Sequence, residues 1–479
     1  MVNITTTSIE EVIEEVSFKV ERARAAQTYW EKLSFTKRKK VLNIFAEGIS
    51  NHCDELTNTV LNETGKKEVD TLLEIALSVT HLRWSARNAR RYLRWKWRRS
   101  NFLTANNIAS VIWKPYGVVG VIGPWNYPIF TPMGSISSAL AAGNAVIFKP
   151  SPYSEAIGKK LVEIWEKSFA KENYLYLFQF LPGDNQYGIE LSKAKINKLS
   201  FTGSSKTGRA VMKTAAENLT PVVIEAGGMD PVFVAADANI AKAITAITWS
   251  AMSNSGQTCI GATRIYVESP IYDNFKVGLI QQIANIDPIL NGDYGPMVLP
   301  GAPQQIEGQV NNILGKDLRI IFQKQIPIND KNATNYLYPI ILESTDPNYD
   351  IPEEIFGPVV VLCKVESITN AIAHLQNSNF GLGASIWSKG QGKKLVPQIK
   401  AGMISINSVN TYAGASLLPF GGVGDSGFGR IHGIEGLKEF SYPVAVSKQI
   451  FSLPFELTSF GKTKTKISIF KKIIKTLNI

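Results

Sequence analysis

Short apolar runs alternate with helix-length stretches along most of this chain, and this alternation constrains the fold more than any other feature. The first series of runs starts near residue 118, and its members are separated by stretches with helical spacing or small residues. They are Val118–Ile122, Ala145–Lys149, Lys198–Phe201 and Pro221–Ile224. Four such β-then-α units predict a parallel sheet that is covered by helices on its faces.

A second series of apolar runs follows the glycine pair Gly227–Gly228. Its members are Val232–Val234, Arg264–Val267, Val359–Leu362 and Met403–Ile406, with a helix-like stretch at Ile240–Met252. We therefore place a domain boundary at the glycine pair and predict an α/β fold. Because no long linker separates the halves, they should pack directly on each other, and binding clefts commonly form at such junctions.

The composition is that of a globular protein. The 479 residues are 44% hydrophobic and 19% charged, and no apolar stretch reaches the roughly 20 residues that cross a bilayer. The first residues lack the basic start and apolar core of a secretory signal, so we expect a cytoplasmic location.

Cysteine and histidine are scarce in this chain. There are three cysteines and four histidines, with no Cys-x-x-Cys pair and no metal-ligand spacing, so we expect neither a disulfide framework nor a bound metal. Cys53 and Cys363 are predicted to be buried, because a free cysteine behaves as a small apolar residue.

The net charge of +11 comes from two segments. Residues 87–99 hold seven basic side chains and residues 462–475 hold six, with no acid in either, so the rest of the chain has a net charge of −2. This distribution argues against a nucleic-acid partner. The first segment carries Trp95 and Trp97, which fits either a membrane interface or the solvated end of a long helix. The apolar face of that helix would lie just upstream and consist of Leu72, Leu73, Ile75, Ala76, Val79 and Leu82.

The C-terminal segment has the pattern of an amphipathic helix. Apolar residues recur at helical spacing opposite Lys471, Lys472 and Lys475, as in a helix that lies at a membrane interface. These apolar residues are Ile467, Phe470, Ile473, Ile474 and Leu477. A helix packed on the protein's own surface, or a frayed end, would have the same pattern.

Cys259 is the strongest candidate for a reactive side chain. It lies in a loop of small residues between Gly256 and Gly261, which let the backbone approach a ligand closely. Glu225 precedes the glycine pair, so it would face Cys259 across the cleft between the halves. A thiol nucleophile and a carboxylate base are thereby suggested.

Three further stretches lie where a predicted strand ends, and a fourth lies in a rigid loop. The turn Gly203–Gly208 opens a helix, whose N-terminus could hold a pyrophosphate or could simply be capped by Ser204. It is not a P-loop, since Arg209 stands where the lysine is required. The other stretches offer the Asn126 amide between two prolines, the Lys149 amine, and the pair Glu354 and Phe356 in a proline-flanked loop.

Taken together, these stretches resemble the aldehyde dehydrogenase superfamily, in the same order from about residue 20 to about residue 450. The final stretch is most similar to the class 3-like or fatty-aldehyde branch. The matching motifs are Pro124–Pro128, Lys149–Ser151, Phe201–Ser204, Glu225–Gly228, Gly256–Cys259, Glu353–Pro358, Pro419–Gly422 and Gly427–Gly433.

The resemblance implies that the protein oxidises an aldehyde to a carboxylic acid with NAD or NADP, through a thiohemiacetal and a thioester on Cys259. Asn126 and the Cys259 N–H would hold the oxyanion, and Glu225 would activate the hydrolytic water. The implied cofactor-binding residues are Trp125, Lys149, Gly203, Ser204, Gly208, Gly227, Glu354 and Phe356.

Two positions depart from the family pattern. Ala226 replaces the usual leucine after the catalytic glutamate. Pro152 stands where many NAD-preferring relatives have a glutamate that repels the 2′-phosphate of NADP.

Two alternative functions remain open at this point. The first is an acylating, coenzyme A-dependent enzyme, which would not need Glu225. The second is a non-catalytic, membrane-peripheral binding protein with the same fold.

The implied architecture has three parts and a tail. A doubly wound, parallel-sheet NAD(P)-binding domain comprises residues 1–100 and 114–227, and an α/β catalytic domain comprises residues 228–440. A small β oligomerisation element, from residues 101–113 and 441–453, implies a homodimer or homotetramer. Residues 454–479 form a basic amphipathic tail, and we expect peripheral membrane contact through the two basic segments.

Overall fold

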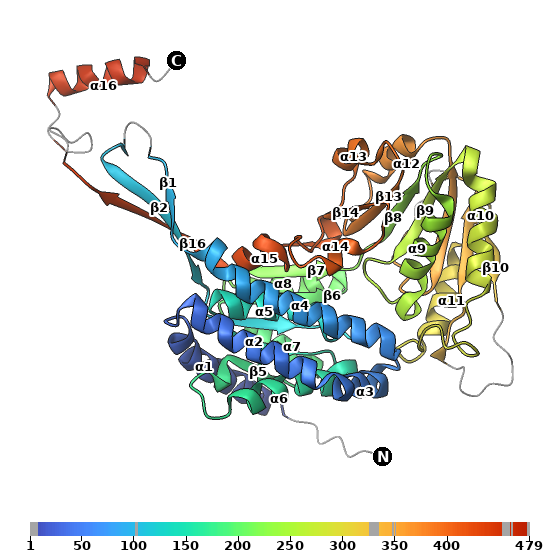
Figure 1. Ribbon diagram of the computed structural model, residues 1–479, viewed down its shortest axis with the longest axis horizontal. Coiled ribbons are helices and arrows are strands. Elements are labelled where there is room, and N and C mark those ends of the chain that lie inside the picture. Colours follow the sequence, from blue (N-terminus) through green and yellow to red (C-terminus); the bar gives the residue numbers. More distant parts are fainter. Residues whose placement is uncertain are drawn as a thin grey trace. The chain divides into compact units, whose positions relative to one another are not determined.

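The computed structural model describes residues 8–100, 104–324, 335–346, 349, 351–452, 460 and 463–476. The chain divides into two compact units. The larger unit comprises Met1–Leu93 and Lys114–Tyr442, and the smaller comprises Arg94–Trp113 and Pro443–Ile479. The α/β class predicted from the alternating pattern is confirmed, with two sheets in the larger unit (Figure 1).

The first sheet has six strands in the order β15-β7-β6-β3-β4-β5. Its members are β3 (Val118–Ile122), β4 (Ala145–Lys149), β5 (Phe178–Phe180), β6 (Lys198–Gly203), β7 (Val222–Ala226) and β15 (Gly427–Phe428). The four predicted strands are parallel, as expected. One detail of the prediction was wrong: β7 is followed by Gly227–Gly228 and then directly by a strand, not by a helix. The edge strand β15 is antiparallel and pairs Gly427 with Glu225.

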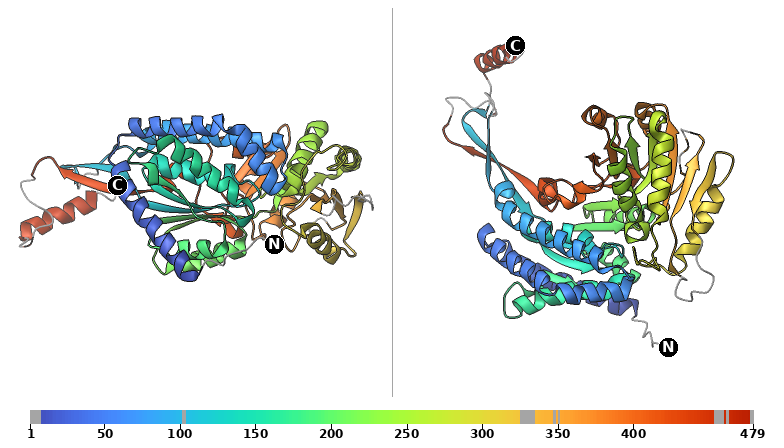
Figure 2. Two further views of the ribbon diagram at one scale, coloured as in Figure 1. Left: turned by 90° about the horizontal axis from the view of Figure 1, so that it is seen from below. Right: turned by 45° about the vertical axis from the view of Figure 1, so that its right-hand side comes forward.

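Helices cover both faces of this sheet (Figure 2). On one face α5 (Phe130–Ala142) and α6 (Glu155–Phe169) contact the strands, with a layer of α2, α3 and α4 packed over them. The outer layer consists of α2 (Phe35–Asn51), α3 (Cys53–Thr64) and α4 (Glu68–Leu93). The other face is covered by α1 (Ile9–Trp30), α7 (Asn185–Lys193) and α8 (Ser205–Ala216).

The second sheet has seven strands in the order β10-β11-β12-β9-β8-β13-β14. They are β8 (Asp230–Val234), β9 (Ala262–Glu268), β10 (Leu318–Gln323), β11 (Ile340–Ser344), β12 (Val359–Val365), β13 (Gly383–Trp387) and β14 (Met403–Ile406). All adjacent pairs are parallel except β10 with β11.

Residues on the inner strand β12 alternate between two apolar cores. Val361 and Cys363 pack toward α11 and α12, whereas Val360 and Leu362 pack toward α9 and α10. This alternation shows that both faces of the sheet are covered, which explains its continuous apolar run. The helices beside this sheet are α9 (Ile240–Met252), α10 (Ser269–Ala284), α11 (Ala302–Ile313), α12 (Ile368–Leu375), α13 (Gly392–Leu395) and α14 (Thr411–Gly414). The last helix of the larger unit, α15 (Gly433–Glu439), packs on α4 and α5 beside the first sheet.

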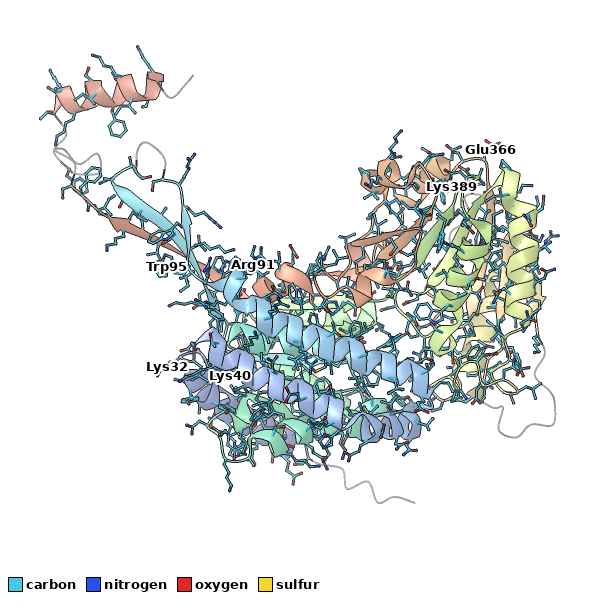
Figure 3. All side chains as sticks on the ribbon, viewed as in Figure 1. Lys32, Lys40, Arg91, Trp95, Glu366 and Lys389 are labelled. Atoms are coloured by element: carbon cyan, nitrogen blue, oxygen red, sulfur yellow. The ribbon has the colours of Figure 1, made fainter. Side chains whose placement is uncertain are left out.

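Three predictions about which side chains are buried or exposed differ in part from the structure. Cys53 is partly exposed, and its thiol donates to Asp54 at 3.4 Å, so the prediction that it is buried was wrong, whereas Cys363 is buried as expected. The buried stripe of α4 leaves out Leu72 and Leu73, which are exposed. The basic segment begins on the last turns of α4 and continues beyond it, so it is not wholly a helix end; Arg91 and Trp95 are both exposed (Figure 3).

The smaller unit contains a three-stranded sheet in the order β1-β2-β16 and one helix. The elements are β1 (Lys96–Arg98), β2 (Asn107–Pro115), β16 (Ser441–Gln449) and α16 (Lys464–Thr476). Of the predicted oligomerisation element and tail, residues 101–103, 453–459, 461–462 and 477–479 lie outside the described residues. Among the residues that are described, no helix combines the length and apolarity needed to cross a membrane.

Candidate functional site

The loop that carries Cys259 is held in an unusual backbone conformation. After α9 ends, Asn254, Ser255 and Gly256 have φ angles of 53°, 59° and 68°, in the left-handed region that L-residues rarely adopt. A Cβ on Gly256 would lie 2.2 Å from the carbonyl carbon of Gly357, so only glycine fits there. The loop is therefore tightly fixed against the neighbouring loop.

Cys259 lies where two cavities of the larger unit meet. One cavity has a volume of about 320 Å³ and a largely apolar wall, and the other has a volume of about 280 Å³ and more polar walls. Among the residues that the structure describes, only Cys259 and Thr131 line both of these cavities. A group bound to the sulfur can thus face two different compartments.

Glu225 lines the second cavity together with Cys259. It lies on β7, is 2% exposed, and neither of its carboxylate oxygens accepts a hydrogen bond from the described residues. Burial raises the pKa of Glu225 to about 7, and its contacts with Cys259 and Thr202 offset this only in part. A carboxylate with a pKa near neutrality can both take up and release a proton at physiological pH.

The thiol of Cys259 is surrounded by acidic groups. Burial raises its pKa well above the usual value, and the Glu225, Asp230 and Glu354 carboxylates raise it further. The pKa values of Asp230 and Glu354 are themselves raised by burial, to about 7 and about 8. The thiol is therefore protonated at neutral pH in this state, and its attack on a carbonyl requires a base to remove the proton.

Asn126 lies on the turn after β3, beside the Cys259 loop. Its side-chain Nδ2 donates to the Gln257 carbonyl at 3.0 Å, and its own carbonyl accepts from Asn254 Nδ2 at 3.0 Å. Asn126 also lines the second cavity with Cys259. Because Nδ2 carries two hydrogens, one remains to bind an oxygen in that cavity.

Six of the eight residues implied to hold the cofactor line the second cavity, and two do not. The six are Trp125, Gly203, Ser204, Gly227, Glu354 and Phe356. Lys149 ends β4, where burial lowers its pKa to about 8. Gly208 lies in the first turn of α8, where an added Cβ would be 3.1 Å from Ile224, so its small size lets α8 approach β7.

The walls of this cavity are closely packed around Glu354. A Cβ on Gly227 would lie 2.0 Å from Glu354 Oε2, so a glycine is needed for the backbone to pass this carboxylate. Trp125 and Phe356 meet edge to face at 5.7 Å. Ser204 caps α8 by accepting from the Thr207 N–H at 3.2 Å, so the capping role exists beside any phosphate-binding role.

Several residues at the site had not been predicted from the sequence. Lys66 and Glu74 form a buried ion pair, and Lys66 Nζ donates to the Asn126 carbonyl. The Tyr127 hydroxyl lies 2.8 Å from Thr258 Oγ1. Tyr127 and Thr258 are within motifs already noted, but nothing near Lys66 or Glu74 in the sequence distinguishes them from surface charges.

The comparisons with known proteins agree with this geometry. Residues 5–446 match the aldehyde dehydrogenase family. The chain is 34% identical to 4,4′-diapolycopene aldehyde oxidase from Methylomonas sp, over 94% of this chain and 84% of the relative. It is 31% identical to a putative NADP+ succinate-semialdehyde dehydrogenase from Mycolicibacterium smegmatis, over 91% of this chain and 85% of the relative.

Solved structures show the same fold with a bound cofactor. Betaine aldehyde dehydrogenase from Staphylococcus aureus in complex with NAD+ superposes with a TM-score of 0.84 at 26% identity, covering 94% of this chain and 92% of that one. PnpE in complex with nicotinamide adenine dinucleotide has a TM-score of 0.85 at 26% identity, covering 92% and 91%. The chain therefore belongs to the aldehyde dehydrogenase family and is an oxidoreductase that oxidises aldehydes with NAD or NADP.

Proposed function

We propose that Cys259 is the nucleophile of this reaction, with Asn126 as oxyanion donor and Glu225 as general base. The observation that carries the proposal is the position of Cys259 at the junction of two cavities, beside a buried carboxylate whose oxygens lack hydrogen bonds within the described chain. The aldehyde would occupy the apolar cavity, and the nicotinamide end of the cofactor would occupy the second cavity.

The residues act in two stages. Cys259 Sγ loses its proton to Glu225, directly or through water, and bonds to the aldehyde carbon, whose oxygen becomes an oxyanion held by Asn126 Nδ2 and the Cys259 N–H. Losing one such donor typically raises the barrier by about 3 kcal/mol. When bound, NAD or NADP accepts the hydride, and a thioester remains on Cys259. Glu225 releases the proton taken from the thiol to solvent and then takes a proton from water, whose oxygen attacks the thioester. The carboxylic acid leaves, and Glu225 returns its proton to the cleaved sulfur to restore the thiol.

The cofactor is held mainly by the first sheet in this proposal. The ends of parallel strands meet at one edge, which brings the turn after β3, Lys149 at the end of β4 and Ser204 after β6 toward the same nucleotide. Residues 1–100 and 114–227 thus act as the cofactor domain, and residues 228–440 carry the nucleophile. Lys149 and Gly208 support the cofactor from outside the cavity next to Cys259.

An extended apolar aldehyde is the substrate that the larger cavity favours. The surface of its wall is mostly apolar, with Leu77, Phe130, Trp249, Ile260 and Phe420 among the lining residues, and an apolar wall binds an alkyl or polyene chain by removing it from water. The Methylomonas relative is named for a polyene aldehyde, 4,4′-diapolycopene aldehyde. That name supports the same substrate class for this chain.

Turnover of a series of aldehydes tests the roles and the substrate class together. The purified protein would be mixed with NAD or NADP and alkyl aldehydes of increasing length, and formation of reduced nicotinamide followed. We expect kcat/KM to rise with chain length, and Cys259→Ala to abolish turnover. Cys53→Ala, a change at a partly exposed cysteine, is the matched control and should keep full activity.

Two outcomes would favour the alternatives. A requirement for added coenzyme A would indicate an acylating enzyme, in which water activation by Glu225 has no part. Folded protein that reduces no cofactor with any aldehyde would indicate the non-catalytic binding protein. Full activity of Cys259→Ala would overturn the assignment of the nucleophile.

Self-association and membrane contact complete the proposal. The sheet β1-β2-β16 serves as the oligomerisation element of a homodimer or homotetramer, and analytical sedimentation of the intact protein would measure its oligomeric state.

Membrane contact is proposed through α16. No described side chain of α16 is buried, and its lysines suit an anionic lipid surface. A cytoplasmic location with peripheral membrane contact rests on these features. Deleting residues 460–479 should abolish co-sedimentation with anionic vesicles, and intact protein should not bind neutral vesicles.

A further inference from the structure

A buried ion pair lies beneath the turn that carries Asn126. Lys66 follows α3, and Glu74 lies in the second turn of α4. Their side chains are each 2% exposed, and Lys66 Nζ lies 2.5 Å from Glu74 Oε1. Burying two charges is unfavourable unless both are well hydrogen-bonded. The remaining partners of the pair therefore indicate what it holds.

Lys66 holds the start of the turn. Its Nζ donates to the Asn126 carbonyl at 2.6 Å and lies 3.8 Å from the centre of the Tyr127 ring. The ammonium group thus contacts the peptide of Asn126 and the aromatic face of the next residue. Charge-assisted hydrogen bonds of this kind are stronger than those between neutral groups.

Glu74 holds the end of the same turn. Its Oε2 accepts from the N–H groups of Ile129 and Phe130, both at 3.1 Å, where α5 begins. These N–H groups have no partner within the helix, so a carboxylate at this place satisfies them and interacts favourably with the helix dipole. The ion pair therefore clamps both ends of residues 126–130.

The clamped turn also contacts the loop of the nucleophile. The Asn126 carbonyl that accepts from Lys66 accepts from Asn254 as well, and Asn126 Nδ2 donates to the Gln257 carbonyl. A shift of the turn would therefore move Asn126 relative to Cys259.

We propose that Lys66 and Glu74 form a positioning pair that fixes the Asn126 side chain for oxyanion binding. This inference rests on the proposed role of Asn126. Neither charge needs to touch the substrate, although Glu74 lies at the wall of the apolar cavity. The pair acts through the backbone of residues 126–130, and its effect should appear in kcat more than in KM for the cofactor.

The test compares single and double variants. Lys66→Met and Glu74→Gln each leave a buried partner uncompensated, so both should lower thermal stability as well as kcat. Lys66→Met combined with Glu74→Met removes both charges, and such replacements of a buried pair are often neutral for stability. We expect this double variant to regain stability and to keep a kcat at least tenfold below that of the parent enzyme. Lys66→Arg, which keeps the charge and donors, should recover part of kcat.

A second ion pair with a buried lysine serves as the control. Lys198 and Glu439 lie 2.6 Å apart with side chains 3% and 26% exposed, and neither residue lines either of the two cavities. Lys198→Met should lower stability and leave kcat per folded enzyme unchanged. If the double variant at Lys66 and Glu74 recovers full kcat together with stability, the pair is only structural and the proposal is wrong.

The Asn126→Ala variant separates this proposal from the one on which it rests. If Asn126→Ala leaves kcat unchanged, the oxyanion role of Asn126 fails and the positioning role fails with it. If Asn126→Ala lowers kcat while the double variant does not, only the positioning pair fails. When Asn126→Ala is combined with the double variant, we expect kcat close to that of Asn126→Ala alone, because the two changes would remove the same interaction.

Discussion

Cys259 and Glu225 line one cavity although they come from opposite sides of the Gly227–Gly228 turn, Glu225 from β7 and Cys259 from the loop before β9. Within the described residues, neither oxygen of Glu225 accepts a hydrogen bond. The carboxylate is therefore available to water or to the thiol.

Glu225→Gln should slow both stages of the reaction. The amide can take a proton neither from the Cys259 thiol nor from water, and loss of a general base typically slows a step by about 10²–10⁴-fold. We expect steady-state turnover to fall by at least about 100-fold on this basis, with Cys259 left largely unmodified in mass spectrometry of the intact protein, because the thiol loses its proton too slowly to be acylated. Glu366→Gln, an exposed control, should behave like the parent enzyme. Full turnover by Glu225→Gln would exclude Glu225 as the base.

The pH dependence should follow the ionisation of Glu225. Its pKa is raised from 4.5 to about 7 by burial, so the population of the active carboxylate form increases as pH rises, and kcat should have an acidic limb centred near pH 7.

The same raised pKa should make stability depend on pH. The folded state binds the Glu225 proton more tightly than the unfolded state does, so this group lowers the free energy of unfolding as pH rises from 4.5 to 7. Glu225→Gln should therefore gain about 2 kcal/mol of relative stability between pH 5 and pH 8 in denaturant titrations. An equal effect of the substitution at both pH values would show that the pKa is not raised.

Gly227→Ala should weaken cofactor binding. The added Cβ would lie 2.0 Å from Glu354 Oε2, so the carboxylate would have to move out of the cavity wall. We expect KM for the nicotinamide cofactor to rise at least about tenfold, equivalent to about 1.4 kcal/mol. Gly308→Ala is the control, since nothing lies within 4 Å of its added Cβ and it lies within α11. An unchanged KM in Gly227→Ala would mean that Glu354 does not contact the cofactor.

Pro152→Glu should shift the enzyme toward NAD. Pro152 is exposed just beyond Lys149 at the end of β4, where a carboxylate would repel the 2′-phosphate of NADP. We expect kcat/KM for NADP to fall at least about tenfold while that for NAD changes little, because like charges brought together across a binding site are strongly unfavourable. Equal losses with both cofactors would place residue 152 away from the 2′ position.

Asp70→Asn should widen the range of aldehydes accepted. Asp70 lines the apolar cavity, and among the described residues of that lining none is basic. A substrate with a distant carboxylate would meet like charge there, so the parent enzyme should disfavour it. In Asp70→Asn we expect kcat/KM for a carboxylate-bearing aldehyde to rise about fivefold or more, with a neutral aldehyde of equal length as the control. No change in this ratio would show that Asp70 does not face the bound substrate.

The sequence predicted the strands well because strands depend on local pattern, and β3, β4 and β12 contain continuous apolar runs. Cys259 is likewise recognisable from a local motif of small residues, and its role as the nucleophile stays a prediction. Lys66 could not be predicted in this way, since its role depends on contacts with residues 8 and 60 positions away. Strand β15 is only two residues long and pairs with β7 across the chain, which no local pattern reveals.

The pairing of β15 with β7 has a consequence for biosynthesis. Because Gly427 lies opposite Glu225, the edge of the first sheet closes only after nearly the whole chain has left the ribosome. Until then β7 has a free edge, and free edges promote pairing with other chains. A premature stop before Gly427 would therefore remove more than the C-terminal tail: it would leave β7, the strand that carries Glu225, exposed to aggregation in an otherwise long polypeptide.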